Sequence, residues 1–274
     1  MMTKSWLYDA ILYVYALSLL FSFSDVARAN QTTKRIGTGL LLFVWVIQTL
    51  YLAVGLYEQR VTFVLTKFDT FFFFAWLLVT LALLIEWFVQ IDLIVFGANV
   101  LGFAVLVLNY LNIPGMAPIN ERWPLNDNLL YTHIALAMIS YVAFTLAALF
   151  AVSYLFLHRR LKEKQWTQQM QRMPSLENMD KLTFATVMIG LILLMSSLVL
   201  GFVCVGLQED STLLYDPKVV NSFLIIAAYT FYIFQRKSSN ASITKLSYMN
   251  LLAFAFVVVN VVVANIVSNF HQWM

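Results

Sequence analysis

Long runs of apolar residues constrain this chain more than any other feature of its sequence. Eight segments each hold about the 20 mostly apolar residues that one helix needs to cross a hydrocarbon core about 30 Å thick. None alternates apolar and polar residues as the strands of a membrane barrel do. The sequence therefore predicts an all-α integral membrane protein, a bundle of eight transmembrane helices in a single domain over residues 1–274. The predicted spans are 5–24, 36–57, 69–89, 93–111, 130–157, 183–206, 219–235 and 246–269.

Composition supports lipid as the solvent for most of the chain. Hydrophobic residues make up 61% and charged residues 11%, whereas a soluble domain carries about 25% charged residues. The first segment follows Lys4 and precedes "VARA", an order that also occurs in signal peptides. Seven further hydrophobic segments make a retained span the simpler interpretation.

The distribution of Lys and Arg among the loops predicts the orientation. Eight crossings place both termini on one side, and five of the seventeen Lys and Arg residues fall on that side, namely Lys4, Arg60, Lys67, Arg122 and Lys218. The other twelve fall on the opposite side, which the positive-inside rule assigns to the cytoplasm. Both termini are therefore expected outside the cell.

The longest predicted cytoplasmic loop covers residues 158–182. It begins with basic residues and contains Ser175, a candidate N-cap for a short helix after Pro174. Two interpretations remain open. The loop can be a solvated connection whose cations are attracted to lipid headgroups, or it can be a docking surface for a soluble partner.

The three histidines divide between the two sides. His133 begins the fifth span and His271 follows the eighth, so both are expected at the outer face, whereas His158 is expected at the cytoplasmic face. The helical face below His133 continues through Ala137, Ser140 and Phe144. Small residues there permit close helix packing or leave room for a flat ligand.

Two facing neutral imidazoles are a natural axial pair for haem iron. A zinc site would need three or four ligands. The alternative is that both histidines are polar residues of the membrane interface. Polar residues within the spans are the other candidates for function, namely Asp9, Glu86, Asn99, Asn221, Asn260 and Asn265.

The sequence contains no GxxxxGK[ST] phosphate loop, no GxSxG and no HExxH. None of these motifs therefore indicates a catalytic site. The lipid bilayer and haem are the expected partners, and no nucleic acid is expected.

Three stretches resemble the cytochrome c assembly proteins, the haem-handling family that includes CcsA- and CcmC-like proteins. "LLYTHIALAMISYVAFTLAALFAVSYLFLHRRLK" resembles the histidine-bearing helix of that family, and "YDPKVVNSFLIIAAYTFYIFQRK" is similar to the stretch after its tryptophan-rich outer loop. "VVNVVVANIVSNFHQW" resembles its final helix, which ends in a second histidine. Order and spacing match over residues 129–273. The resemblance implies that His133 and His271 are the axial metal ligands of one haem, expected to be haem b.

The chain departs from the family at the tryptophan-rich loop. It has Tyr215 where a tryptophan is expected, and it keeps Asp216, Pro217 and Lys218. The chain most resembles an eight-span branch associated with bacterial haem biosynthesis genes. That resemblance implies a non-enzymatic protein of the bacterial plasma membrane that binds haem and lowers the level of glutamyl-tRNA reductase. The reductase would be reached directly or indirectly through the loop 158–182.

Two other functions remain open at this point. A haem transporter, or a cytochrome c maturation factor presenting haem at the outer face, would normally have further histidines within its spans. This sequence has none at mid-depth. The second is a structural or assembly protein without a ligand.

Overall fold

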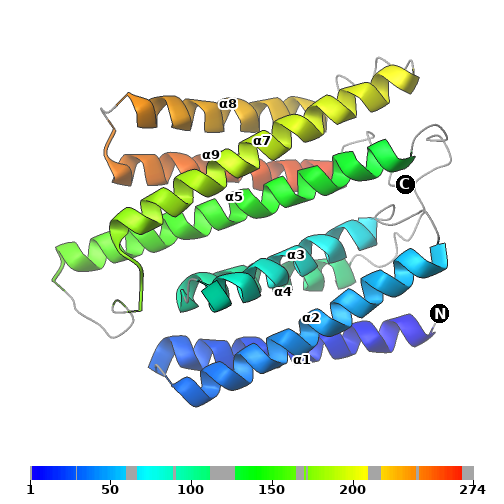
Figure 1. Cartoon of the computed structure of the whole chain (residues 1–274), viewed down its shortest axis with the longest axis horizontal. Helices are drawn as coiled ribbons and strands as arrows, with labels where there is room; N and C mark the ends of the chain where they lie inside the picture. The colour runs from blue at the N-terminus through cyan, green and yellow to red at the C-terminus, as the bar shows by residue number, and fades with distance from the viewer. Residues whose placement is uncertain are drawn as a thin grey trace. The chain divides into compact units, whose positions relative to one another are not determined.

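A computed structural model describes residues 2–28, 30–59, 67–88, 91–111, 127–164, 170, 172–208, 217–238 and 241–266. Within these residues the fold consists of eight long α-helices and no strands (Figure 1). In chain order they are α1 (Met2–Arg28), α2 (Gln31–Gln59), α3 (Lys67–Phe88), α4 (Asp92–Leu111), α5 (Asp127–Lys162), α7 (Leu176–Gln208), α8 (Pro217–Lys237) and α9 (Ile243–Ile266). All eight are long and apolar enough to cross a membrane, which confirms the predicted class of fold.

The helices extend beyond the spans predicted from hydropathy, most clearly on either side of the predicted loop 158–182. Helix α5 continues to Lys162, and α7 begins at Leu176 rather than near residue 183. Ser175 caps α7, because its hydroxyl oxygen accepts the N–H of Asn178 at 3.2 Å. The short separate helix expected after Ser175 is thus the first part of α7, and the connection between the two helices is shorter than predicted.

The chain divides into two compact units, each described here by itself. The first comprises Met1–Met116 together with Lys164–Pro174, and the second comprises Ala117–Glu163 and Ser175–Met274. The segment between α5 and α7 therefore belongs to the first unit, although both helices belong to the second. A single membrane domain over residues 1–274 stays a prediction.

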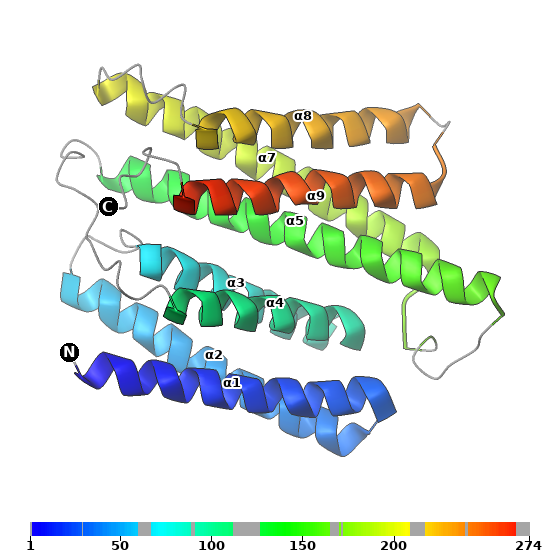
Figure 2. The same cartoon turned by 180° about the vertical axis from the view of Figure 1, so that it is seen from behind.

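In the first unit, α1 packs on α2 and α4, and α3 packs on α2 and α4 (Figure 2). The links between α1 and α2 and between α3 and α4 are only a few residues long. Aromatic and aliphatic side chains from all four helices fill the core, among them Tyr8, Ile11, Tyr15, Leu41, Val44, Phe72, Ala75 and Leu106.

A reciprocal pair of hydrogen bonds joins α2 to α3. The indole N–H of Trp45 donates to the Thr80 hydroxyl at 2.9 Å, and that of Trp76 donates to the Thr49 hydroxyl at 2.9 Å. Each threonine hydroxyl donates in turn to a backbone carbonyl of its own helix. Polar groups within the unit thus satisfy each other where lipid offers no partner.

In the second unit, α5 packs against α7 and α9, and α8 packs against α9 and α7. Asparagine side chains of α9 join it to its neighbours. Asn250 donates to the carbonyl of Ala147 in α5 at 2.8 Å, and Asn260 donates to the hydroxyls of Tyr141 at 3.2 Å and Ser222 at 3.0 Å. These amides connect helices, which is a common role of polar side chains in membrane bundles.

The surface along the helices carries large apolar side chains. Leu20 is 66% exposed, Phe88 79% and Val199 62%. Helices that are apolar on the outside as well as on the inside are typical of membrane spans, so lipid is the solvent that these residues meet.

Gly190 of α7 allows an aromatic pair to pack closely. The rings of Phe144 and Tyr229 stack with their centroids 4.1 Å apart. A Cβ atom on Gly190 would lie 2.7 Å from Cε1 of Phe144, closer than van der Waals contact allows.

Gly190→Ala is therefore expected to lower the melting temperature of the detergent-solubilised protein. Overpacking costs about 1–3 kcal/mol, which exceeds the roughly 0.5–1 kcal/mol that alanine contributes over glycine inside a helix. Gly206→Ala is the control, because a Cβ there meets nothing within 4 Å, and its melting temperature should stay the same or rise. Thermal unfolding followed by circular dichroism measures both, and equal shifts would contradict the close packing at Gly190.

Candidate functional site

His133 lies near the N-terminal end of α5 and is held by α7. Its Nδ1 atom lies 2.6 Å from the backbone oxygen of Ser197 and 3.1 Å from the Ser197 hydroxyl oxygen. The Ser197 hydroxyl donates to the backbone oxygen of His133 at 2.8 Å. Ser197 is buried and His133 half-buried, so the ring is fixed at a level where α5 and α7 meet.

The contact with Ser197 determines which ring nitrogen carries a proton. A backbone carbonyl can only accept a hydrogen bond, so Nδ1 must be the donor. In the neutral ring the lone pair then lies on Nε2. Histidines that bind metal ions almost always donate their other ring N–H to a carbonyl, carboxylate or water. The donor set at His133 therefore fits an axial ligand of haem iron.

Gly201 lies directly against the imidazole of His133. A Cβ atom at Gly201 would lie 2.9 Å from Cε1 and 3.1 Å from Nδ1 of the ring. Neither Gly201 nor Ser197 was predicted from the sequence. Their signal was a pair of small residues one helical turn apart at the predicted depth of His133.

The face of α5 below His133 serves helix packing. Ser140 and Phe144 are fully buried. The Ser140 hydroxyl donates to the carbonyl of Ala137 at 2.7 Å, and Phe144 stacks on Tyr229. The idea that this stripe leaves room for a flat ligand was therefore wrong at Ser140 and Phe144, where protein fills the space.

The structure describes one of the other two histidines. His158 lies at the opposite end of α5 from His133, and its ring stacks on Tyr154 with centroids 5.8 Å apart. His271 lies outside the described residues, five positions beyond the end of α9. Within the described ranges, no group of three or more His, Cys, Asp and Glu residues gathers as a metal site.

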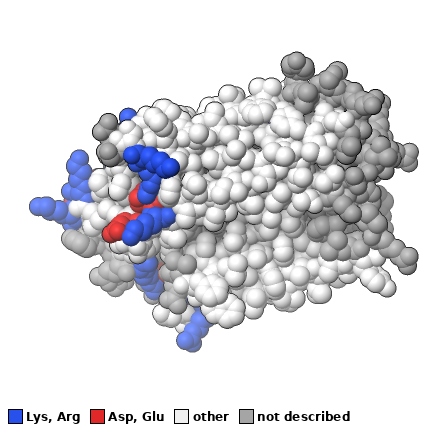
Figure 3. Space-filling view, turned by 45° about the horizontal axis from the view of Figure 1, so that its top comes forward, with Lys and Arg blue, Asp and Glu red and all other residues white. Residues whose placement is uncertain are grey.

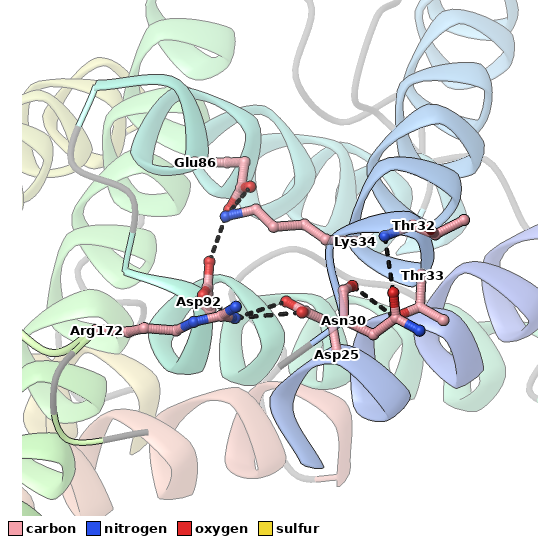
Figure 4. Close-up of polar contacts among 8 residues, drawn as sticks. All are labelled: Asp25, Asn30, Thr32, Thr33, Lys34, Glu86, Asp92 and Arg172. Atoms are coloured by element: carbon pink, nitrogen blue, oxygen red, sulfur yellow. Dashed lines mark hydrogen bonds and ion pairs between the residues drawn. The ribbon is translucent and has the colours of Figure 1, made fainter. Parts of the chain in front are cut away.

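A network of ionised side chains connects the helices at one end of the first unit (Figure 4). The sequence did not predict this network. Lys34 of α2 pairs with Glu86 of α3 at 2.9 Å and with Asp92 of α4 at 2.6 Å. Arg172, between α5 and α7 in the sequence, pairs with Asp92 at 3.1 Å and with Asp25 of α1 at 3.2 Å. Three carboxylates and two cations thus link four helices and the connecting segment.

Arg172 stays charged in this setting. Burial by itself lowers the pKa of its guanidinium, but the hydrogen bonds and negative charges of Asp25 and Asp92 outweigh burial and raise the pKa. The Asp25 side chain is only 4% exposed, so Arg172 is the cation that compensates a deeply buried carboxylate.

The second unit has its own ion pair. Arg236 near the end of α8 donates to both carboxylate oxygens of Asp180 in α7, at 2.6 and 2.7 Å, and lies over the Phe184 ring at 4.5 Å. Figure 3 shows the visible charged side chains gathered at one end of the view. Arg236 is one of the twelve Lys and Arg residues that the positive-inside rule predicts to lie in the cytoplasm.

Comparisons with known proteins agree with the resemblance noted from the sequence. The family model described as "Cytochrome C assembly protein" matches residues 64–271, a range that includes both His133 and His271. The chain is 35% identical over 268 residues to Protein HemX of Brevibacillus brevis, and the match covers 98% of each chain. It is 30% identical over 263 residues to Protein HemX of Bacillus subtilis (strain 168), with 96% of this chain and 95% of the relative covered.

Arg172→Gln is expected to destabilise the protein by about 1–3 kcal/mol, because it leaves the buried Asp25 carboxylate without its cation. Chemical unfolding in detergent measures the change. Arg159→Gln removes the same charge from a side chain that is 82% exposed, and it should leave stability nearly unchanged. Equal stability of the two variants would mean that the network contributes nothing to the fold.

Proposed function

The chain belongs to the cytochrome c assembly protein family, and from that premise we propose that it binds haem and regulates haem biosynthesis without acting as an enzyme. His133 and His271 would be the two axial ligands, with haem b as the bound form. Ligation would lower the level of glutamyl-tRNA reductase. The observation that carries the proposal is the hydrogen bond from Nδ1 of His133 to the Ser197 carbonyl.

The register between α5 and α9 supports pairing His133 with His271. Asn260 contacts Tyr141 and Asn250 contacts Ala147, so the two helices run antiparallel. His133 precedes Tyr141 by eight residues in the sequence, and His271 follows Asn260 by eleven. This alignment supports the proposal that both histidines lie at the same membrane face. The haem iron supplies two axial positions, which two neutral imidazoles can fill.

The charge distribution supports a bacterial plasma-membrane protein with both termini outside. Twelve of the seventeen Lys and Arg residues lie on the side of the segment between α5 and α7, which the positive-inside rule assigns to the cytoplasm. In this orientation the His133 end of α5 faces outward. The site would therefore sample haem at the outer surface of the membrane.

Helix α5 would connect the site to the cytoplasm. It is 36 residues long, or about 54 Å at 1.5 Å per residue. Its cytoplasmic end carries Arg159, Arg160 and Lys162, of which Arg159 is largely exposed. We propose that these cations form the part of the stretch 158–182 that reaches glutamyl-tRNA reductase, directly or through another protein.

The alternative function is haem transport or presentation to apocytochrome c, as the family description suggests. That function would call for a second haem site on the inner side. His158 is the one histidine at that end of α5, and its ring packs on Tyr154 among basic residues. The regulatory function is therefore favoured.

Absorption spectra of the purified protein test the ligand set. The reduced protein should show the split α and β bands of low-spin haem. His133→Ala and His271→Ala should each abolish the low-spin spectrum, because six-coordinate iron needs both imidazoles. His158→Ala is the matched control and should keep it. A colourless protein purified from haem-replete cells would refute haem binding altogether.

Charge reversal tests the cytoplasmic surface. Changing Arg159, Arg160 and Lys162 to glutamate should restore the reductase to the level found in cells that lack this protein. Quantitative immunoblotting measures that level at matched membrane expression. Lys237→Glu with Lys245→Glu reverses exposed charges elsewhere on the same side and should have no effect. Arg172 stays unchanged throughout, since it pairs within the first unit. A reductase level unaffected by the triple variant would remove this surface from the model.

A further inference from the structure

We propose that Ser197 and Gly201 of α7 are positioning residues that select the ring nitrogen of His133 presented to the iron. This inference rests on the proposed haem binding and goes beyond the identity of the ligands. Because Gly201 has no side chain, the backbone carbonyl of Ser197 is exposed on α7. This carbonyl accepts the hydrogen bond from Nδ1 of His133. Nε2 is thereby left as the nitrogen with the lone pair.

Helix geometry explains why the residue at 201 must be small. In an α-helix, the amide of residue 201 donates to the carbonyl of residue 197. Side chains tilt toward the N-terminus, so a side chain at position 201 would cover the outer side of that carbonyl. The three atoms nearest to a Cβ at Gly201 all belong to the His133 ring, at 2.9, 3.1 and 3.6 Å. The imidazole thus occupies the space that a side chain would take.

The Ser197 hydroxyl adds further hydrogen bonds between α7 and His133. It donates to the backbone oxygen of His133 at 2.8 Å, so its proton is already committed. Its oxygen can then accept from Nδ1 at 3.1 Å, while the Ser197 carbonyl accepts from the same nitrogen at 2.6 Å. One residue of α7 therefore fixes both the backbone and the ring of His133.

This arrangement has a chemical consequence beyond packing. The neutral side chain of a free histidine in water favours the proton on Nε2, the nitrogen that would have to face the iron here. Holding the proton on Nδ1 prepares the ring for ligation before haem arrives. A hydrogen bond donated by the Nδ1–H group of His133 also raises the basicity of Nε2. A more basic ligand favours the oxidised iron.

The first measurement requires no haem. Protein labelled with ¹⁵N-histidine and prepared without haem is examined by NMR at pH 8, and His158→Gln and His271→Gln assign the three rings. We expect the His133 ring to carry its proton on Nδ1. In Gly201→Ala that preference should be lost, because the Cβ displaces the ring. Gly206→Ala, in the same helix with nothing within 4 Å of the added Cβ, should retain it.

The second measurement adds haem. Gly201→Ala should bind haem about 10–100-fold more weakly than the unaltered protein, the usual effect of losing a partner of a metal ligand. Its reduction midpoint should also become more positive. Ser197→Ala keeps the carbonyl and removes only the hydroxyl. It should therefore retain the Nδ1 proton and lose less affinity, and it provides a test if Gly201→Ala fails to fold.

The outcomes separate this inference from the proposed function. An Nε2 proton on His133 in the unaltered protein would overturn the inference whether or not haem binds. So would identical proton positions and affinities in Gly201→Ala and Gly206→Ala, or loss of the Nδ1 proton in Ser197→Ala. If Nδ1 carries the proton but no haem binds to any form, the proposed function fails, and with it the role of the contact in ligation.

Discussion

Hydrocarbon offers no hydrogen-bond partner, and this constraint governs where polar groups lie within the spans. Most of the polar side chains described there bond to a carbonyl of their own helix or to a neighbouring helix, as Thr49 and Asn250 do. His133 obeys the same rule. Its ring would be costly to bury without a partner for Nδ1, and α7 supplies that partner only where the helix surface lacks a side chain. In the proposed function, the contact that satisfies this polar group would also prepare His133 as an iron ligand.

The class of fold could be predicted because membrane thickness sets the length of each apolar run. The ends of the helices could not. Hydropathy detects where lipid stops, whereas Ser175 begins α7 by capping, and capping operates outside the hydrocarbon. The position of His133 near the start of the fifth span followed from the apolar run. Its partners did not, because α7 is apolar on all sides and its sequence does not reveal which face meets α5.

The ion network shows a different limit of the sequence. Lys34, Glu86 and Asp92 lie near the ends of their predicted spans. The predicted topology was therefore enough to place these three side chains at the same level of the membrane. Pairing them with Arg172 was not, since Arg172 looked like one of several cations in a basic loop. The pairing of Arg172 depends on the tertiary structure around Asp25. Asp25 is buried, and a buried carboxylate requires a cation within reach.

The assignment of Lys164–Pro174 to the first unit affects the order in which the protein can be completed. Asp25 and Asp92 belong to helices that leave the ribosome early, and Arg172 follows only after the whole of α5. Proteins made on the ribosome generally fold from the N-terminus onward. The first four helices would therefore enter the membrane with the Asp25 carboxylate lacking its cation. The first unit can be completed only after α5, the first helix of the second unit, has been synthesised. Assembly of the first unit therefore depends on synthesis of part of the second.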